Sequence, residues 1–179
     1  MNELVEKMHR ALDNLPKEEL LKLTDLLLNN KDKQIFVFGN GGSWALAQHF
    51  AADLSKLGFK IICVPSSIAE LTMWGNDDGY DTIFARPIQN LIKPKDIVVA
   101  ISSSGNSSNV VKAIKHAKLL GGIIVGFSGF EASNTLNQFS DIKIHIPTQK
   151  GEYGIVETTH DAILHLLVED LKDAMHSVQ

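Results

Sequence analysis

Two stretches of the chain carry imidazole and carboxylate groups spaced four residues apart. His49 and Asp53 form one pair, and Glu157, Asp161 and His165 form a series with the same spacing. Residues four apart lie on one face of a helix, so each stretch presents an imidazole and a carboxylate to one point. Two histidines with carboxylates suit Zn²⁺ or a similar divalent ion, and the same groups suit general acid–base chemistry. Taken singly, such a pair is more often an exposed surface pair than a functional one.

The place of the first pair in the sequence favours a functional role. His49 and Asp53 follow a glycine-rich segment, residues 39–43 (GNGGS), on the helix that leaves it. Glycines let a backbone approach a ligand closely. The pattern differs from the dinucleotide fingerprint G-x-G-x-x-G, and residues 64–67 (VPSS) after the second strand offer no acid to a ribose. We therefore predict a ligand loop that does not bind NAD.

A second polar segment, residues 102–108 (SSSGNSS), follows an apolar strand and precedes a helix. Hydroxyls and backbone N–H groups that converge at a helix N-terminus bind phosphate. The segment contains no lysine, so it is not a Walker-type nucleotide loop. The alternative is an ordinary serine-rich turn with an N-cap. Five serines in seven residues exceed what capping requires, which favours a site for a sugar phosphate.

Short apolar runs alternate with helical stretches from residue 34 onward. The predicted strands are 34–38, 60–64, 96–101, 123–127 and 142–146, and the predicted helices between and after them are 44–57, 110–120 and 155–174. Such alternation implies right-handed βαβ crossovers, and near-continuous apolar strands imply a sheet covered on both faces. The expected fold is α/β: a three-layer α/β/α sandwich with a five-stranded, mostly parallel sheet. Ligands bind at the carboxyl ends of such strands, where we place the polar loops 39–43, 75–79 and 102–108.

The first part of the chain predicts two further helices within residues 2–29, broken at 14–16 (NLP). Their leucine stripes are typical of packing or subunit contact rather than of catalysis. We interpret residues 1–30 as a helical extension that packs on a single domain spanning 1–179.

Composition narrows the class of protein. The 179 residues are 44% hydrophobic and 21% charged, with a net charge of −4, which gives no support to nucleic-acid binding. Cys63 is the only cysteine, so no intrachain disulfide forms. The amphipathic start of the chain lacks the apolar block of a signal peptide, and no apolar run has the length of a membrane span. We expect a cytoplasmic protein without a membrane partner.

Four segments, taken in order, resemble those of phosphoheptose isomerase, a family with the SIS (sugar isomerase) fold. They are residues 38–43 (FGNGGS), 47–51 (AQHFA), 75–77 (GND) and 101–107 (ISSSGNS). The final helix, with Glu157 eight residues before His165, fits as well. Each motif is modest alone, but their order and spacing together are specific, and the resemblance covers nearly the whole chain.

The resemblance implies an aldose–ketose isomerase that interconverts sedoheptulose 7-phosphate and a heptose 7-phosphate. It also implies zinc and a homotetramer with active sites at subunit interfaces. Carried over by position, the substrate contacts are Asn40, Gly41, Gly42, Asn76, Asp77, Ser102, Ser103, Ser104, Ser107 and Glu157. The implied metal ligands are His49, Asp53, Glu157 and His165.

Two positions depart from the family pattern. At the position of Asp53 the family usually has a Glu, which is assigned as the catalytic base, and at the position of Glu157 it usually has a Gln. We predict Asp53 as the base and His165 as the acid, and the departures leave the identity of the sugar open. One alternative is a non-catalytic SIS module that binds a sugar phosphate or a protein partner, although Asp53 and His165 favour the enzyme. An epimerase or an aldolase is a further alternative, but no lysine stands in the site loops for a Schiff base.

Overall fold

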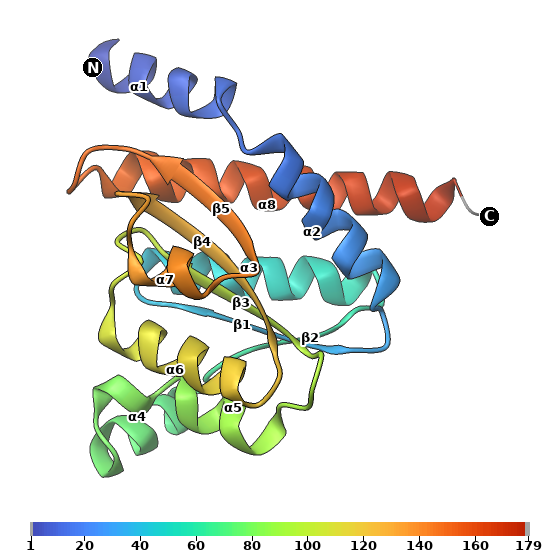
Figure 1. Ribbon diagram of the computed structural model, residues 1–179, viewed down its shortest axis with the longest axis vertical. Coiled ribbons are helices and arrows are strands. Elements are labelled where there is room, and N and C mark those ends of the chain that lie inside the picture. The colour runs from blue at the N-terminus through green and yellow to red at the C-terminus, as the bar shows by residue number, and fades with distance from the viewer. Residues whose placement is uncertain (1, 178–179) are drawn as a thin grey trace.

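The computed structural model describes residues 2–177, along which strands and helices alternate (Figure 1). The strands are β1 (Gln34–Gly39), β2 (Lys60–Cys63), β3 (Ile97–Ser102), β4 (Ile123–Phe130) and β5 (Ile142–Pro147). The helices are α1 (Asn2–Asp13), α2 (Lys17–Asn29), α3 (Gly42–Lys56), α4 (Ile68–Asp77), the 3₁₀ turn η1 (Tyr80–Thr82), α5 (Ala85–Leu91), α6 (Ser108–Leu119), α7 (Thr135–Phe139) and α8 (Tyr153–His176). The two predicted N-terminal helices are confirmed as α1 and α2. Met1, Val178 and Gln179 of the predicted domain lie outside the described residues.

The strands form one sheet in the order β2-β1-β3-β4-β5, and each neighbouring pair is parallel. The predicted five-stranded α/β sandwich is thereby confirmed. β1 lies between β2 and β3, so the chain turns one way after β1 and the other way after β3. Ligands bind at such a switch point, outside the carboxyl ends of the two strands. Gly39 pairs with Ile101, so the segments that follow β1 and β3 start side by side.

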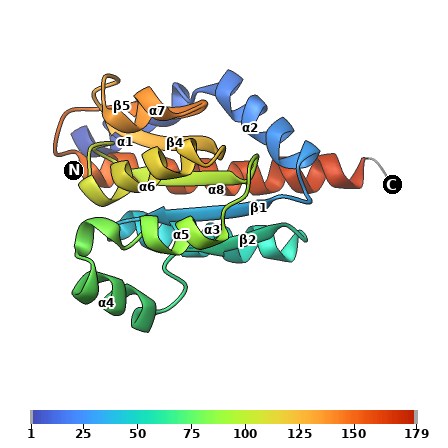
Figure 2. The same ribbon diagram turned by 60° about the horizontal axis from the view of Figure 1, so that its bottom comes forward.

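Helices cover both faces of the sheet, and each face has its own apolar core (Figure 2). On one face, side chains such as Val37 of the sheet pack with Phe50 of α3 and Ile163 of α8. On the other face, Phe38 packs with helices α5, α6 and α7, where Ile114 is fully buried. Burial of this apolar area holds the three layers together. It also fixes α3 and α8 on the same face of the sheet.

The segment between β2 and β3 forms helices that the sequence reading did not assign. The expectation that residues 75–79 form a loop at a strand end was wrong, because Gly75, Asn76 and Asp77 lie in the last turn of α4. A reciprocal cap starts this helix: the Ser67 hydroxyl accepts from the Glu70 N–H, and the Glu70 carboxylate accepts from the Ser66 N–H.

α8 is 24 residues long and lies beside α1, α2 and α3 (Figure 1). Its buried face is mostly apolar but includes Thr159 and His160, and its acidic side chains are half-buried or exposed. Among residues 2–177, no helix combines the length and the apolar character that crossing a membrane requires.

His160 of α8 is fully buried, and its Nε2–H donates to the carbonyl oxygen of Ser128 at 3.2 Å. Burial lowers the pKa of His160 to about 4, because the apolar surroundings disfavour the imidazolium. Nearby, burial also lowers the pKa of His145, whose Nδ1 lies 2.9 Å from the Ser128 hydroxyl.

We expect acid to destabilise the fold through His160. Its pKa is lower in the folded state than its ordinary value of 6.5, so the unfolded chain takes up the proton first as the pH falls. The stabilising contribution is complete above pH 6.5 and declines towards pH 4, by up to about 3 kcal/mol. Urea unfolding at pH 7, 6 and 5 measures it. The variant His160→Gln should show a weaker dependence, to which His145 still contributes. Equal slopes in parent and variant would contradict this role.

Candidate functional site

The serine loop between β3 and α6 forms one wall of a small cavity at the carboxyl end of the sheet. The cavity is about 110 Å³ in volume. Its lining residues are Asn40, Ser43, Ile101, Ser102, Ser103, Ser104, Ser107, Tyr153 and Glu157. We call it the serine cradle. The sequence-predicted serines 102, 103, 104 and 107 thus come together at one place, and Asn40 and Glu157 line the same cavity.

The hydroxyl groups of the cradle differ in the hydrogen bonds that they make. The Ser102 hydroxyl accepts from the Gly105 N–H at 3.2 Å, which closes the loop on itself. Ser107 is the N-cap residue of α6, yet its side chain makes no capping bond. The Ser103 hydroxyl is buried and has no hydrogen-bond partner among the described residues. A buried polar group without a partner is costly, so a water or a ligand group in the cavity would satisfy this hydroxyl.

Gly105 gives the loop its shape. Its φ of +61° lies in the left-handed region, and a Cβ there would come within 2.1 Å of the Asn134 side chain. Only glycine fits this conformation and this contact. The turn leads to Ser107, the N-cap residue of α6, which lines the cradle, and the N-terminus of a helix is favourable for an anion.

The glycine segment after β1 brings the N-terminus of α3 to the same cavity. Gly41 is the N-cap residue of α3, with a φ of +54°, and no side chain caps this helix. A Cβ on Gly42 would lie 2.6 Å from a carboxylate oxygen of Glu157. The glycine therefore makes room for Glu157, whose negative charge lies at the positive end of α3.

Asn40 is held by two neighbours that the sequence reading did not single out. Its amide exchanges two hydrogen bonds with the amide of Asn109, at 2.8 and 2.9 Å, and accepts from the Tyr80 hydroxyl at 3.1 Å. Asn109 is buried in the first turn of α6. These bonds link α6 and η1 to the cradle and fix the orientation of Asn40. The one feature of the sequence that could have pointed to Asn109 as part of the site is its position directly after the serine loop.

A second group of polar side chains lies between α3 and α8. The rings of His49 and His165 meet edge to face, with centroids 5.0 Å apart. Nε2 of His49 lies 3.5 Å from Oδ2 of Asp53, and Nε2 of His165 lies 3.8 Å from Oδ1 of Asp161. We call these four residues the imidazole cluster. Ligand atoms of His49, Asp161 and His165 all lie within 4.8 Å of one another, and such a set of nitrogen and oxygen donors fits a divalent ion.

The serine cradle and the imidazole cluster lie at different positions along the helices α3 and α8. Glu157 lines the cradle, whereas His165, eight residues later, belongs to the cluster. At a rise of about 1.5 Å per residue, the Cα atoms of these two residues are ~12 Å apart along α8. The structure therefore brings His49, Asp53 and His165 together as expected, with Asp161 beside them, and places Glu157 at the cradle.

Asn76 and Asp77 line neither the cradle nor the cluster. They are exposed at the end of α4, where the Asn76 amide donates to the Asp77 carboxylate at 2.8 Å.

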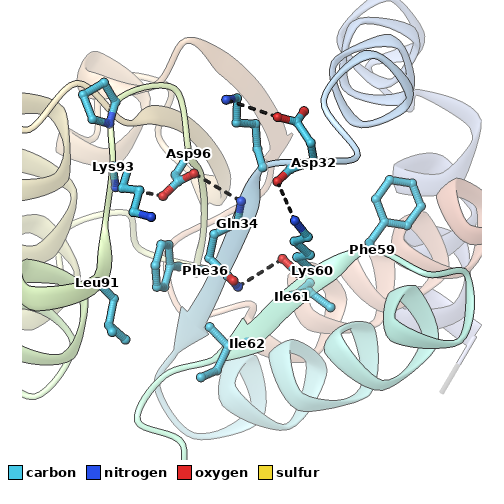
Figure 3. A pocket seen from close by; sticks show the side chains of 12 residues that line it. Asp32, Gln34, Phe36, Phe59, Lys60, Ile61, Ile62, Leu91, Lys93 and Asp96 are labelled. Carbon is cyan, nitrogen blue, oxygen red and sulfur yellow. Dashed lines mark hydrogen bonds and ion pairs between the residues drawn. The ribbon is translucent and has the colours of Figure 1, made fainter.

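A larger hollow, of about 770 Å³, opens at the opposite end of the sheet (Figure 3). Its one buried acid, Asp96, accepts from the backbone N–H groups of Gln34 at 3.1 Å and of Lys93 at 2.8 Å. Asp96 thereby ties the starts of β1 and β3 together, and this structural role accounts for it. The hollow lies at the amino ends of the strands, so it has no part in the chemistry described above.

Comparisons with known proteins identify the family of the chain. A model of the SIS domain matches residues 2–129. The chain is 34% identical to a probable phosphoheptose isomerase of Thermoplasma acidophilum, over 91% of this chain and 92% of that protein. It is 37% identical to a phosphoheptose isomerase of Mycobacterium tuberculosis, over 79% and 74% of the two chains. The solved structure of a phosphoheptose isomerase from Neisseria gonorrhoeae superposes with a TM-score of 0.87 at 27% identity, covering 96% of this chain and 94% of that one.

We expect Ser103→Ala to weaken binding of inorganic phosphate by at least about tenfold, because a hydrogen bond to a charged group contributes roughly 1.5–3 kcal/mol. Calorimetric titration with phosphate measures the change. Ser55→Ala is the matched control, since its hydroxyl lies in the last turn of α3 and bonds to the Ala52 carbonyl. Equal phosphate affinity in the two variants would remove Ser103 from the anion site.

Proposed function

The chain belongs to the phosphoheptose isomerase family of SIS-domain proteins, and from this membership we propose that it is an aldose–ketose isomerase of sugar phosphates. The substrate pair that the family implies is sedoheptulose 7-phosphate and a heptose 7-phosphate. The single observation that carries the proposal is the buried, unpartnered hydroxyl of Ser103 in a cavity at the N-terminus of α6. Neutral hydroxyls at a helix N-terminus suit a phosphate dianion without a bridging metal.

The serine cradle anchors the phosphate and so positions the sugar chain. Ser102, Ser103, Ser104 and Ser107 supply hydroxyls, and α6 supplies backbone N–H groups. Asn40, held rigidly by Asn109 and Tyr80, contacts a sugar hydroxyl. Gly41 and Gly42 allow the sugar to approach the backbone, and Asn76 and Asp77 remain proposed contacts that would approach from α4. Fixing one end of a substrate brings its reacting carbons to a defined place.

The reaction moves a proton between C1 and C2 of the open-chain sugar. We assign removal of the proton beside the carbonyl to the Asp53 carboxylate, and proton transfer between the two oxygens to His165. Asp53 lies 3.5 Å from His49 and 3.5 Å from the Lys56 ammonium, and both groups hold its carboxylate in place. A bound divalent ion such as Zn²⁺, held by His49, Asp53 and His165, would polarise the carbonyl.

The separation of cradle and cluster supports a site shared between subunits. Asp53 lies eleven residues after Gly42, which is ~16 Å along the axis of α3. A sugar phosphate anchored at the cradle reaches a cluster more readily if a neighbouring copy supplies it. Exposed apolar residues, among them Leu4 and Val5 of α1 and Leu166 of α8, are available for subunit contact. We therefore propose a homotetramer in which one copy offers the cradle and its neighbour the cluster.

Deuterium exchange tests the reaction. The protein is incubated with a panel of ketose phosphates in deuterated water. The sugar that is its substrate should gain deuterium at the carbon beside the carbonyl. Asp53→Asn should slow this by at least about a hundredfold, because it removes the base. Asp25→Asn, at an exposed acid of α2, is the control and should leave the rate unchanged. Absence of exchange with every sugar of the panel would favour the non-catalytic sugar-phosphate module instead.

Mixing two inactive variants tests the shared site. Ser104→Asp places a negative charge in the cradle and repels phosphate, and His165→Ala removes the acid from the cluster. In a randomly mixed oligomer, about a quarter of the shared sites combine an intact cradle with an intact cluster, so activity returns. If each chain uses its own cluster, the mixture stays as inactive as its components, and the shared site is excluded.

A further inference from the structure

Asn106 stands in the middle of the serine loop, but it does not line the cradle as its neighbours Ser104 and Ser107 do. Its exposed side chain reaches instead to Thr135, the first residue of α7, 29 residues further along the chain. We propose that Asn106 and Thr135 are positioning residues that hold the serine loop in its anion-binding shape before a ligand arrives. This role rests on the proposed function, in which the loop is the anchor for the phosphate.

The serine loop and α7 satisfy each other's polar groups. The Thr135 N–H and the Thr135 hydroxyl both donate to Oδ1 of Asn106, at 2.9 and 2.8 Å. The next N–H of α7, that of Leu136, donates to the carbonyl oxygen of Gly105 at 2.9 Å. The first N–H groups of a helix have no acceptor within that helix, so the loop supplies acceptors that α7 lacks. The two segments therefore form one unit, although they follow different strands of the sheet.

Asn106 also contacts the cradle, through its backbone. Its N–H donates to the hydroxyl oxygen of Ser104 at 3.3 Å. On the other side of Ser104, the carbonyl oxygen of Ser103 accepts from the N–H of Gly129, near the end of β4, at 2.9 Å. The backbone on both sides of Ser104 is thus fixed by segments outside the loop. A displacement of Asn106 would therefore carry the Ser104 hydroxyl away from its place in the cradle.

Order in the loop before binding affects the affinity for phosphate. A loop of serines with a glycine has much conformational freedom, and any freedom that is lost on binding lowers the affinity. The bonds to Thr135, Leu136 and Gly129 form without a ligand, so the loop is already ordered in the free protein. An asparagine that only capped a short helix would affect stability alone, and one that contacted the substrate would act without Thr135. Each of these two other roles predicts a different result in the experiments that follow.

Calorimetric titration with inorganic phosphate tests the role of the pair. Asn106→Ala should bind phosphate at least about fivefold more weakly than the parent chain, which is the loss expected for a single neutral hydrogen bond. Thr135→Ala should weaken binding less, because the Thr135 N–H still donates, and Thr135→Ser should bind as the parent does. Gln138→Ala is the matched control, because this exposed side chain of α7 donates to the Ser133 carbonyl at 2.8 Å and not to the serine loop.

The double variant Asn106→Ala/Thr135→Ala separates positioning from direct contact with the ligand. If Asn106 acts together with Thr135, loss of the Thr135 hydroxyl has no further effect once the Asn106 side chain is gone. The double variant should then bind phosphate as Asn106→Ala does. Losses of affinity that multiply in the double variant would show two independent contributions and would overturn the pairing.

Amide hydrogen exchange without phosphate measures the order of the loop directly. The N–H of Gly105, which donates to the Ser102 carbonyl at 2.9 Å, should exchange faster in Asn106→Ala than in the parent chain or in Gln138→Ala. Unchanged exchange, or parent-like phosphate affinity in Asn106→Ala, would overturn the role of Asn106. If Ser103→Ala still bound phosphate more weakly in that case, the proposed function would stand. A parent chain that binds no phosphate would overturn the proposed function and this role together.

Discussion

Gly39 lies where three elements meet: the end of β1, the neighbouring strand β3 and the start of α3. They are packed so closely there that no side chain would fit. A Cβ at this position would lie 2.7 Å from the carbonyl oxygen of Ile101 and 2.7 Å from Cβ of Ser43. The contact brings the two strand ends together at the point where the connections diverge, one to α3 and the other to α6. Two helix N-termini and two polar loops therefore face one cavity, and the remaining features of the site depend on that placement.

The helices α3 and α8 both contribute residues to the serine cradle and to the imidazole cluster. Their contacts advance in step: Gly42 meets Glu157, and His49 meets His165 further along both helices. The two helices therefore run side by side in the same direction on one face of the sheet (Figure 1). Apolar side chains of both helices, among them Phe50 and Leu164, pack in the core on this face of the sheet. The position of a side chain along α3 or α8 therefore decides whether it lies at the serine cradle or in the imidazole cluster.

The parts of the fold that follow from local pattern were predictable from the sequence. Apolar strands, alternation with helices and the polar loops after β1 and β3 require only periodicity and turn chemistry, and they predicted the observed sandwich. The short helices between β2 and β3 were missed, although the Ser67-to-Glu70 spacing that caps α4 was present. Helical periodicity placed Glu157, Asp161 and His165 on one face, but it carries no information about which part of α3 faces each of them. That assignment is a tertiary property, and so are the contacts of Asn40 with Asn109 and Tyr80.

A carboxylate beside a phosphate site raises an electrostatic question, because Glu157 and a phosphate dianion repel each other. The two helix ends at the cradle answer it. Glu157 lies against Gly42, at the positive end of α3, and the serine loop leads into the positive end of α6. The proposed phosphate and the Glu157 carboxylate would therefore lie at different helix N-termini, and each positive helix end offsets part of the repulsion between them. A neutral side chain at position 157 would leave the end of α3 open to an anion, whereas Glu157 occupies that end, so in the proposed site the phosphate binds at the serines before α6.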